Sequence, residues 1–297
     1  MIASACTKDN AIKEECRVEV VFDTGRPGSK SADPSDEDAI NDVNIFVFNS
    51  LSGLLETHVY LDRKTYGKQP LGMNLLTNVR YNVAACLNCG YRLPDIKSMD
   101  ELPSFRYYMV YPDDYSAGMP MAAYKEGFVP GKEEGPLVLQ ATRLLAKIYL
   151  TIDRSALNSD VTMTVAEAEI GGCPRSITPF SASKPEGKND VFSKGFYKKG
   201  IQADNLNRDN GGGKSGEVCL YMFESINSAV SPYIQLRLNY LSRETSAGNG
   251  KWLYYRFYIG EKEGNTDIKR NTRYHFTVFP HGTGIEGNPS WKVEFTD

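Results

Sequence analysis

Few residues of this chain are of types that could do chemistry. Among 297 residues there are three histidines, His58, His275 and His281, and six cysteines. Catalysis by side chains needs a nucleophile beside a base, two carboxylates across a cleft, or a metal ion. His275 stands in the alternating run "RYHFTVF", where cross-strand packing explains it, and no G-x-S-x-G motif surrounds any serine. The sequence therefore predicts a protein that is not an enzyme.

Two further patterns could bind a metal ion or carry redox chemistry. Cys86 and Cys89 form one C-x-x-C pair, but zinc needs two further ligands, and a redox pair needs a strand-to-helix turn in an alternating α/β sequence. The acidic residues within 33–38 lack the glycine and the closing glutamate of a calcium loop. We expect incidental thiols at a strand end, a solvated acidic loop, and no metal or cofactor.

Cys6 is the cysteine whose surroundings indicate a modification. It follows the small residues Ala3, Ser4 and Ala5 and precedes a polar stretch. Bacterial lipoprotein precursors are cut before such a cysteine, whose thiol then takes the lipid, although the basic and apolar regions of a signal peptide are absent here. We predict lipidation of Cys6, with a free thiol in the N-terminal segment as the alternative.

The composition is that of a globular protein, with 41% hydrophobic and 24% charged residues. The net charge of -3 provides no basic stripe that could neutralise phosphates, so nucleic acid is not expected as a partner. The longest apolar run, "LLAKIYLTI", is far shorter than a membrane span and carries a lysine. We therefore expect no membrane helix.

The elements that position these residues are predicted to be strands. Short runs of alternating apolar and polar residues, separated by Gly, Pro, Asn and Asp, are typical of antiparallel sheet. The clearest runs are Val43–Asn49, Val79–Asn88, Trp252–Gly260, Arg273–Phe279 and Trp291–Phe295. The charged segment "PGKEEGP" is the best linker. We predict an all-β chain with short helices in loops: a flexible segment over 1–16, and two β-sandwich domains over 17–135 and 136–297.

Six segments match, in order, short patterns that occur together in one family. They are "EDAINDVNIFVFNSLSGLL", "NVRYNVAACLNCG", "GMPMAAY", "TRLLAKIYLTI", "CLYMFES" and "IKRNTRYHFTVFPHGTG". The fourth carries an Arg-x-x-Ala-Lys-Ile pattern (Arg143, Ala146, Lys147, Ile148), the fifth a Tyr-x-x-Glu pattern, and the sixth an Arg-Asn-x-x-Tyr pattern (Arg270, Asn271, Tyr274). Together they resemble the Bacteroides-type fimbrillin family, whose members build or anchor surface fimbriae.

The resemblance implies two tandem transthyretin-like Greek-key β-sandwich domains, lipidation at Cys6, and a surface-exposed place in a fimbrium at the outer membrane. It also implies assembly with other fimbrial subunits by β-strand exchange, in which an added strand satisfies backbone groups that a missing strand leaves unpaired. Trypsin-like processing points would be Arg17 and Arg26, which flank the predicted first strand, Arg17 to Gly25.

The last strand decides between roles within such a fimbrium. Trp291, Val293 and Phe295 form the candidate strand-exchange segment, and no separate donor strand follows them. We expect this segment to be integral to its own sandwich, and the protein to be a non-enzymatic anchor or accessory subunit that supports adhesion to a host protein or glycan. One alternative is a polymerising stalk or tip pilin. Another is a surface lipoprotein that binds glycans through the aromatic run from Trp252 to Tyr258.

Overall fold

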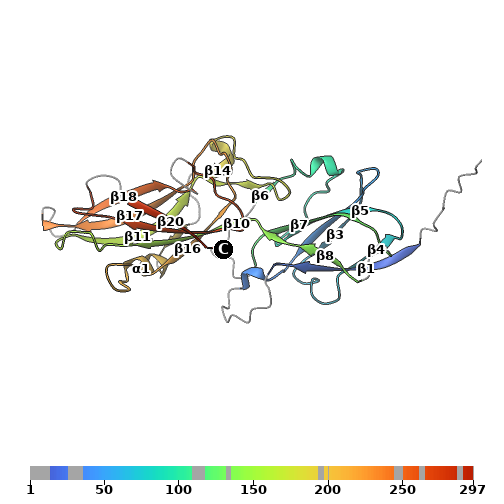
Figure 1. The fold of residues 1–297 in the computed structure, drawn as a ribbon, viewed down its shortest axis with the longest axis horizontal. Coiled ribbons are helices and arrows are strands. Elements are labelled where there is room, and N and C mark those ends of the chain that lie inside the picture. Colours follow the sequence, from blue (N-terminus) through green and yellow to red (C-terminus); the bar gives the residue numbers. More distant parts are fainter. Residues whose placement is uncertain are drawn as a thin grey trace, which may run out of the picture. The chain divides into compact units, whose positions relative to one another are not determined.

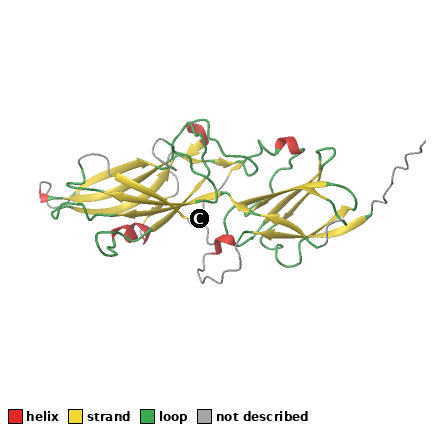
Figure 2. Cartoon of the chain, in the orientation of Figure 1, coloured by secondary structure: helices red, strands yellow, loops and turns green. Residues whose placement is uncertain are grey.

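The computed structural model describes residues 14–25, 36–108, 118–131, 135–192, 197–199, 201–243, 250–260, 265–285 and 290–296. The chain forms two compact units, built almost entirely of strands (Figures 1 and 2). Unit 1 comprises Met1–Phe105 and Ser116–Thr142, and unit 2 comprises Arg106–Tyr115 and Arg143–Asp297. The predicted all-β architecture is confirmed. Within the described ranges, no helix is long and apolar enough to cross a membrane.

Unit 1 is a sandwich of a three-stranded and a five-stranded sheet, with strand orders β4-β1-β8 and β3-β2-β5-β7-β9. Its core is a single cluster that includes Val18, Val20, Ile45, Val83 and Leu139. The strands are β1 (Glu15–Asp23), β2 (Val43–Asn49), β3 (Leu55–Leu61), β4 (Gly72–Leu76), β5 (Tyr81–Leu87), β7 (Met121–Phe128), β8 (Leu137–Gln140) and β9 (Thr142–Arg143), with single 3-10 turns η1 (Asp36–Asp38) and η2 (Met99–Glu101).

Unit 2 has two four-stranded sheets, β16-β10-β19-β20 and β15-β11-β17-β18, and two small two-stranded sheets, β12-β14 and β13-β6. A second, separate core cluster lies within it. Its elements are β6 (Tyr107–Tyr108), β10 (Leu145–Ile152), β11 (Thr162–Gly171), β12 (Cys173–Pro174), β13 (Ser176–Ile177), η3 (Lys188–Asp190), β14 (Val191–Phe192), β15 (Tyr197–Lys199), α1 (Ile201–Asn207), β16 (Val218–Phe223), β17 (Tyr233–Leu241), β18 (Lys251–Tyr258), β19 (Arg273–Phe279) and β20 (Ser290–Thr296).

The predicted domain boundary is wrong in two places. Residues 136–142 belong to unit 1, because β8 pairs with β1 and completes the three-stranded sheet. Residues 106–115 belong to unit 2, where β6 pairs with β13. The segment "PGKEEGP" therefore connects β7 to β8 inside unit 1 and is no linker between units, since glycines and charges mark a connection without saying what it joins.

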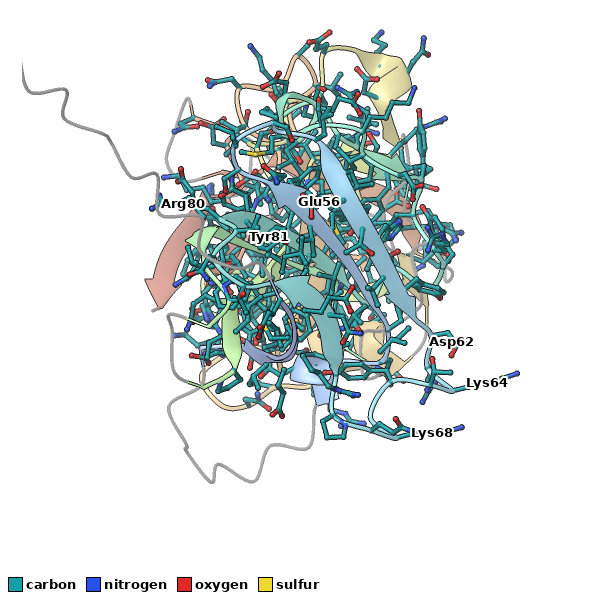
Figure 3. The ribbon with its side chains drawn as sticks, turned by 90° about the vertical axis from the view of Figure 1, so that its right-hand side faces the viewer. Glu56, Asp62, Lys64, Lys68, Arg80 and Tyr81 are labelled. Atoms are coloured by element: carbon teal, nitrogen blue, oxygen red, sulfur yellow. The ribbon has the colours of Figure 1, made fainter. Side chains whose placement is uncertain are left out.

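Strand β5 is buried along its whole length because both faces of its sheet are covered. On one face the buried side chain of Tyr81, labelled in Figure 3, belongs to the core. Its hydroxyl accepts the N–H of Leu76 at 3.2 Å. On the other face the amide of Asn82 lies against the sulfur of Met99, 2.9 Å away, in the segment that follows β5. Unit 1 thus has a third, irregular layer over its five-stranded sheet.

Candidate strand-exchange site

Strand β1 lies between β4 and β8, antiparallel to the first and parallel to the second. Its two ladders overlap only at Val20. Residues Glu15–Glu19 pair with β4, and Val20–Asp23 pair with β8. One further backbone bond, from Val20 N–H to the Leu71 carbonyl at 2.8 Å, continues the first ladder. Each half of β1 is therefore paired along one side, although the strand occupies the middle of its sheet.

The side chains of β1 alternate between core and solvent, as the run "RVEVVF" predicts. Val18 and Val20 are 7% and 5% exposed, and Cys16 and Phe22 pack partly buried against the same cluster. We call the edges of β4 and β8, with the core positions that these four side chains fill, the β1 slot. It holds a strand by backbone pairing and by four alternating apolar side chains.

Both ends of β1 are held by polar contacts. At the start, the Glu14 carbonyl accepts the Thr77 N–H at 2.8 Å. At the end, the Asp23 carboxylate accepts the Gly25 N–H at 2.9 Å and the Gln140 side-chain amide at 2.9 Å. The hydrogen bond from Gly25, and then that from Gln140, hold the pKa of Asp23 below its usual value. Asp23 thus ties the turn after β1 to β8.

The predicted processing points relate differently to this strand. The predicted strand began at Arg17, but β1 begins at Glu15, so Arg17 lies inside the β4 ladder. Its guanidinium lies over Gly72, where a Cβ would be 2.8 Å from the Arg17 Nε. Because a paired residue cannot enter a protease cleft in extended form, cleavage after Arg17 requires β1 to open. Arg26 and Cys6 lie outside the described residues.

The candidate segment with Trp291, Val293 and Phe295 lies in β20 of unit 2. Strand β20 pairs antiparallel with β19 from Arg273↔Thr296 to Phe279↔Ser290, and it is the edge strand of its sheet. The backbone of β20 is therefore paired within a sheet of its own unit, as expected for a segment that is integral to its sandwich. Its side chains lie outside the described part of the chain. Arg17 and this segment belong to different units.

The remaining sequence candidates have structural roles. His275 stacks on Tyr149, its neighbour across the β10–β19 ladder, with 4.6 Å between ring centroids. Cys86 is fully buried in β5, and burial raises the pKa of its thiol. Within the described ranges, no group of three or more His, Cys, Asp and Glu side chains is placed to hold a metal ion.

One network among the quoted motif segments was missed by sequence reasoning. Glu224, directly after β16, and Arg270, just before β19, form an ion pair of 2.6 Å with side chains 9% and 16% exposed. The Arg270 guanidinium also donates to the carbonyls of Thr178, Pro179 and Ser181. Both residues stand in segments that carried the family resemblance, but nothing local in either segment predicts that they meet.

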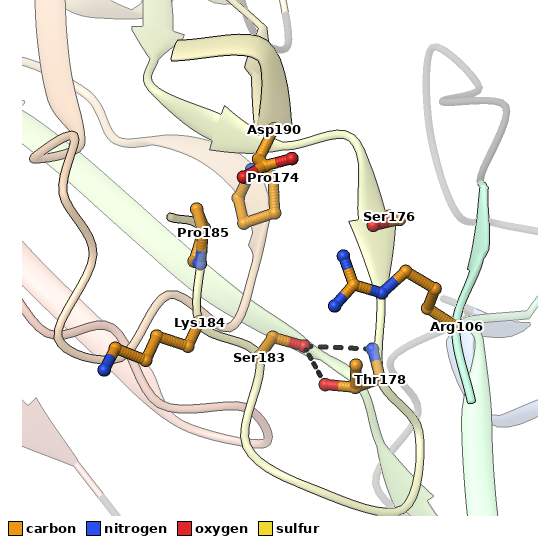
Figure 4. A pocket seen from close by; sticks show the side chains of 8 residues that line it. All are labelled: Arg106, Pro174, Ser176, Thr178, Ser183, Lys184, Pro185 and Asp190. Atoms are coloured by element: carbon orange, nitrogen blue, oxygen red, sulfur yellow. Dashed lines mark hydrogen bonds between the residues drawn. The ribbon is translucent and has the colours of Figure 1, made fainter. Parts of the chain in front are cut away.

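A small polar pocket lies beside this network in unit 2 (Figure 4). Within it the Thr178 and Ser183 hydroxyls lie 2.9 Å apart, and Ser183 Oγ accepts the Thr178 N–H at 3.1 Å. These hydrogen bonds stabilise the loop that follows β13. The other residues that line the pocket are Arg106, Pro174, Ser176, Lys184, Pro185 and Asp190.

The two-sandwich fold is shared with solved bacterial adhesion and fimbrial proteins. The chain is similar over 96% of its length to 95% of a putative cell adhesion protein of Bacteroides eggerthii, with a TM-score of 0.62 and 13% identity. It also resembles the C-terminally truncated tip fimbrial protein Mfa3 of Porphyromonas gingivalis, with a TM-score of 0.55 and 12% identity over 95% of this chain and 98% of that one.

A fimbrilin, FimA, of Porphyromonas gingivalis matches with a TM-score of 0.54 and 13% identity, over 94% of this chain and 96% of that one. No protein-family model and no curated protein sequence matches the chain. At these identities the comparison establishes the fold, which is that of fimbrial proteins over nearly the whole length. The structural match predicted from the six segments is thereby confirmed.

Proposed function

We propose that this protein is a non-enzymatic, surface-exposed fimbrial subunit of the anchor or accessory kind, which joins other fimbrial subunits by β-strand exchange at the β1 slot. The observation that carries the proposal is the split pairing of β1. A strand whose halves are each paired on one side has fewer backbone hydrogen bonds to break than a fully paired central strand. A replacing strand from a partner regains them and adds pairing where β1 has none.

The pairing of β20 supports the anchor or accessory role over that of a polymerising subunit. A stalk subunit must offer a strand as well as accept one. Here the described residues of β20 are engaged with β19 over seven residue pairs. An edge strand is nevertheless held on one side only, so a polymerising stalk or tip pilin that detaches β20 is the second candidate.

The proposed location is the outer membrane, with a lipid on Cys6 as the anchor. The support is the small residues before Cys6 in the sequence. Mass spectrometry of membrane-extracted protein tests this part: acyl chains on Cys6 are expected, and an unmodified thiol on the mature protein overturns the lipid anchor while leaving the exchange proposal intact.

Strand exchange is tested with a fluorescent peptide of the β1 sequence, Glu15–Asp23. The purified chain is treated with a trypsin-like protease, the protease is inhibited, and the peptide is added. We expect uptake after cleavage and none before it. A peptide with Val18→Asp and Val20→Asp is the matched control, because a charge cannot enter the slot without a partner. Arg26 precedes Pro27, a bond that trypsin-like proteases cut poorly, so the cut between β1 and η1 is expected after Lys30. A chain with Arg26→Gln and Lys30→Gln should therefore stay uncut there and take up no peptide.

The exchange proposal fails if the cleaved chain keeps its own β1 and takes up no peptide on prolonged incubation, or if it takes up the Asp-bearing peptide equally well. The stalk alternative makes a different prediction. After cleavage, a polymerising subunit forms ladders that resist denaturant on gels, whereas an anchor or accessory subunit alone stays monomeric.

A further inference from the structure

The outward face of β17 and β18 in unit 2 carries an unusual set of exposed side chains. These two strands are adjacent in one sheet (Figure 1). On β18, Trp252, Tyr254 and Tyr258 are 52%, 62% and 55% exposed, and Arg256 stands between the two tyrosines. We call these four residues, with the outward β17 residues Tyr233, Gln235, Arg237 and Asn239 opposite them, the β17–β18 platform.

Arg256 is held flat on this platform. Its guanidinium carbon lies 4.4 Å from the centre of the Tyr233 ring. Its Nε and Nη2 donate to Gln235 Oε1 at 3.1 and 2.6 Å. Gln235 is in turn fixed, because its amide donates to Glu169 Oε1 at 2.7 Å, and Glu169 is only 7% exposed. A guanidinium fixed in this way loses little freedom when it binds a ligand.

Arg237 also lies over an aromatic ring, but unlike Arg256 it forms an ion pair with a carboxylate. It lies over the Trp252 ring at 4.2 Å and forms an ion pair with Glu167 at 3.1 Å. The partner recorded for Arg256 is the neutral Gln235, and among the described residues no carboxylate forms an ion pair with it. A fixed positive charge, with which no described carboxylate forms an ion pair, therefore stands between two exposed aromatic rings.

We propose that the β17–β18 platform binds an acidic polysaccharide, with sugar rings stacked on the aromatic side chains and a sugar carboxylate on Arg256. Exposed Trp and Tyr provide large rigid contact areas at low entropic cost. A guanidinium and a carboxylate form short, charge-assisted hydrogen bonds. From Trp252 to Tyr258 the strand extends about 20 Å, at about 3.3 Å per residue, which accommodates several sugar rings in a row.

The composition of the platform favours a sugar over a protein partner. Its eight outward positions hold aromatic and polar side chains but no aliphatic one. Tyr, Trp and Arg are also common in protein interfaces, but the centre of an interface is depleted of charged residues as a class, and burying this platform there would cover Arg256, Arg237 and Glu167 together. A sugar, which carries many hydroxyl groups, can instead stack on the rings and form hydrogen bonds with the polar side chains between them. This inference goes beyond the proposed function and does not depend on it.

The test measures binding of the purified full chain to four immobilised acidic polysaccharides: polygalacturonate, alginate, hyaluronan and polysialic acid. We expect at least one to bind. Where polygalacturonate binds, its fully methyl-esterified form is the matched neutral probe and should bind at least tenfold more weakly. Polyglutamate carries charge without sugar rings and should not bind.

Variants of the platform locate the binding. Arg256→Gln should weaken it about 10- to 100-fold, the range of a charge-assisted hydrogen bond, and Trp252→Ala should weaken it about tenfold or more. Tyr124→Ala and Arg92→Gln remove an exposed aromatic ring and an exposed guanidinium of unit 1 and should leave binding unchanged. Circular dichroism checks that each variant is folded.

Three results overturn the proposal. One is that none of the four polysaccharides binds. Another is binding that neither platform variant weakens, or that polyglutamate reproduces, which reduces it to general charge attraction. The third is selection of peptides from a random display library through Trp252 without polysaccharide binding, which assigns the platform to a protein partner.

Discussion

Strands β1 and β10 occupy equivalent places in the two units but are held very differently. Each lies between an antiparallel and a parallel neighbour, β4 and β8 for β1, and β16 and β19 for β10. The ladders of β1 meet end to end at residues 19 and 20. Those of β10 run over Leu145–Leu150 and Lys147–Ile152, so Lys147–Leu150 is paired on both sides. One topology thus holds one strand loosely and the other firmly.

Burial follows the same division. The inward residues of β10, Ala146, Ile148, Leu150 and Ile152, are at most 3% exposed. On β1 only Val18 and Val20 are buried, at 7% and 5% exposed, and the flanking inward positions are partly exposed. The comparison teaches that two sandwiches can share one strand arrangement while one central strand is paired and buried far less completely than the other.

The largest predicted effect concerns the ion pair that joins the neighbours of β10. Glu224 follows β16 and Arg270 precedes β19, and removing one partner of a largely buried pair costs about 3–5 kcal/mol. We expect Arg270→Met to destabilise unit 2 by about that amount in denaturant unfolding. Arg237→Gln, which breaks a more exposed pair, should cost less than about 1 kcal/mol. Similar losses in both variants would show that the pair is not what secures this sheet.

The next effect compares truncations to alanine at one core position in each strand. Ile148→Ala in β10 should destabilise unit 2 by about 2–5 kcal/mol, because the doubly paired strand cannot shift to fill the cavity. Val18→Ala in β1 should cost about 1–2 kcal/mol in unit 1, from the lost apolar burial. Scanning calorimetry that resolves the two transitions measures both. An equal or greater loss for Val18→Ala contradicts the view that β1 is the replaceable strand.

Hydrogen exchange tests the comparison without any substitution. Amides of Lys147–Leu150 should exchange only through global opening of unit 2. Amides of β1 should exchange roughly tenfold faster or more, through local opening, because local opening free energies range from about zero up to the global value. Equal protection of both strands would place β1 in the stable core of its unit.

Sequence alternation predicted the strands well but not their partners. The runs Val43–Asn49 and Arg273–Phe279 coincide with β2 and β19, and Trp252–Gly260 overlaps β18 closely. Alternation reports which face of a strand is buried, whereas pairing depends on residues far away in the chain. That is why β8 was assigned to the wrong domain: its place beside β1 joins residues 20–23 to 137–140.

The candidate strand-exchange site, like the sheets, could be predicted in its strands but not in its long-range contacts. The apolar run of β1 and its alternation could be read directly, but the start of the strand could not, so Arg17 was taken as its first residue although β1 begins at Glu15. The pairing of Glu224 with Arg270 spans 46 residues and leaves no local signal. Such a contact follows only from the folded sheet, in which β16 and β19 flank β10.

The smallest predicted effect uses a feature that both strands share. Asp23 ends β1 and accepts the Gly25 N–H, and Asp153 directly follows β10 and accepts the Ser155 N–H at 3.0 Å. The pKa of both carboxylates is held below the usual value, that of Asp23 first by the Gly25 N–H and that of Asp153 first by the Ser155 side chain and then by the Ser155 N–H. A lowered folded pKa gives stabilisation that is complete above the unfolded pKa of about 3.9 and is lost as the pH falls through the folded pKa.

Acid should therefore weaken the turns after β1 and after β10 to a similar extent, but only β1 should open more readily as a result. In β1 the Asp23 carboxylate also binds Gln140 and so ties the turn to β8, on which the second half of the strand depends. Asp23→Asn at neutral pH should slightly speed hydrogen exchange over Val20–Asp23. Asp153→Asn should leave β10 unchanged, because both its ladders remain. If Asp153→Asn loosened β10 as much as Asp23→Asn loosens β1, the overlap of ladders would not be what distinguishes the two strands.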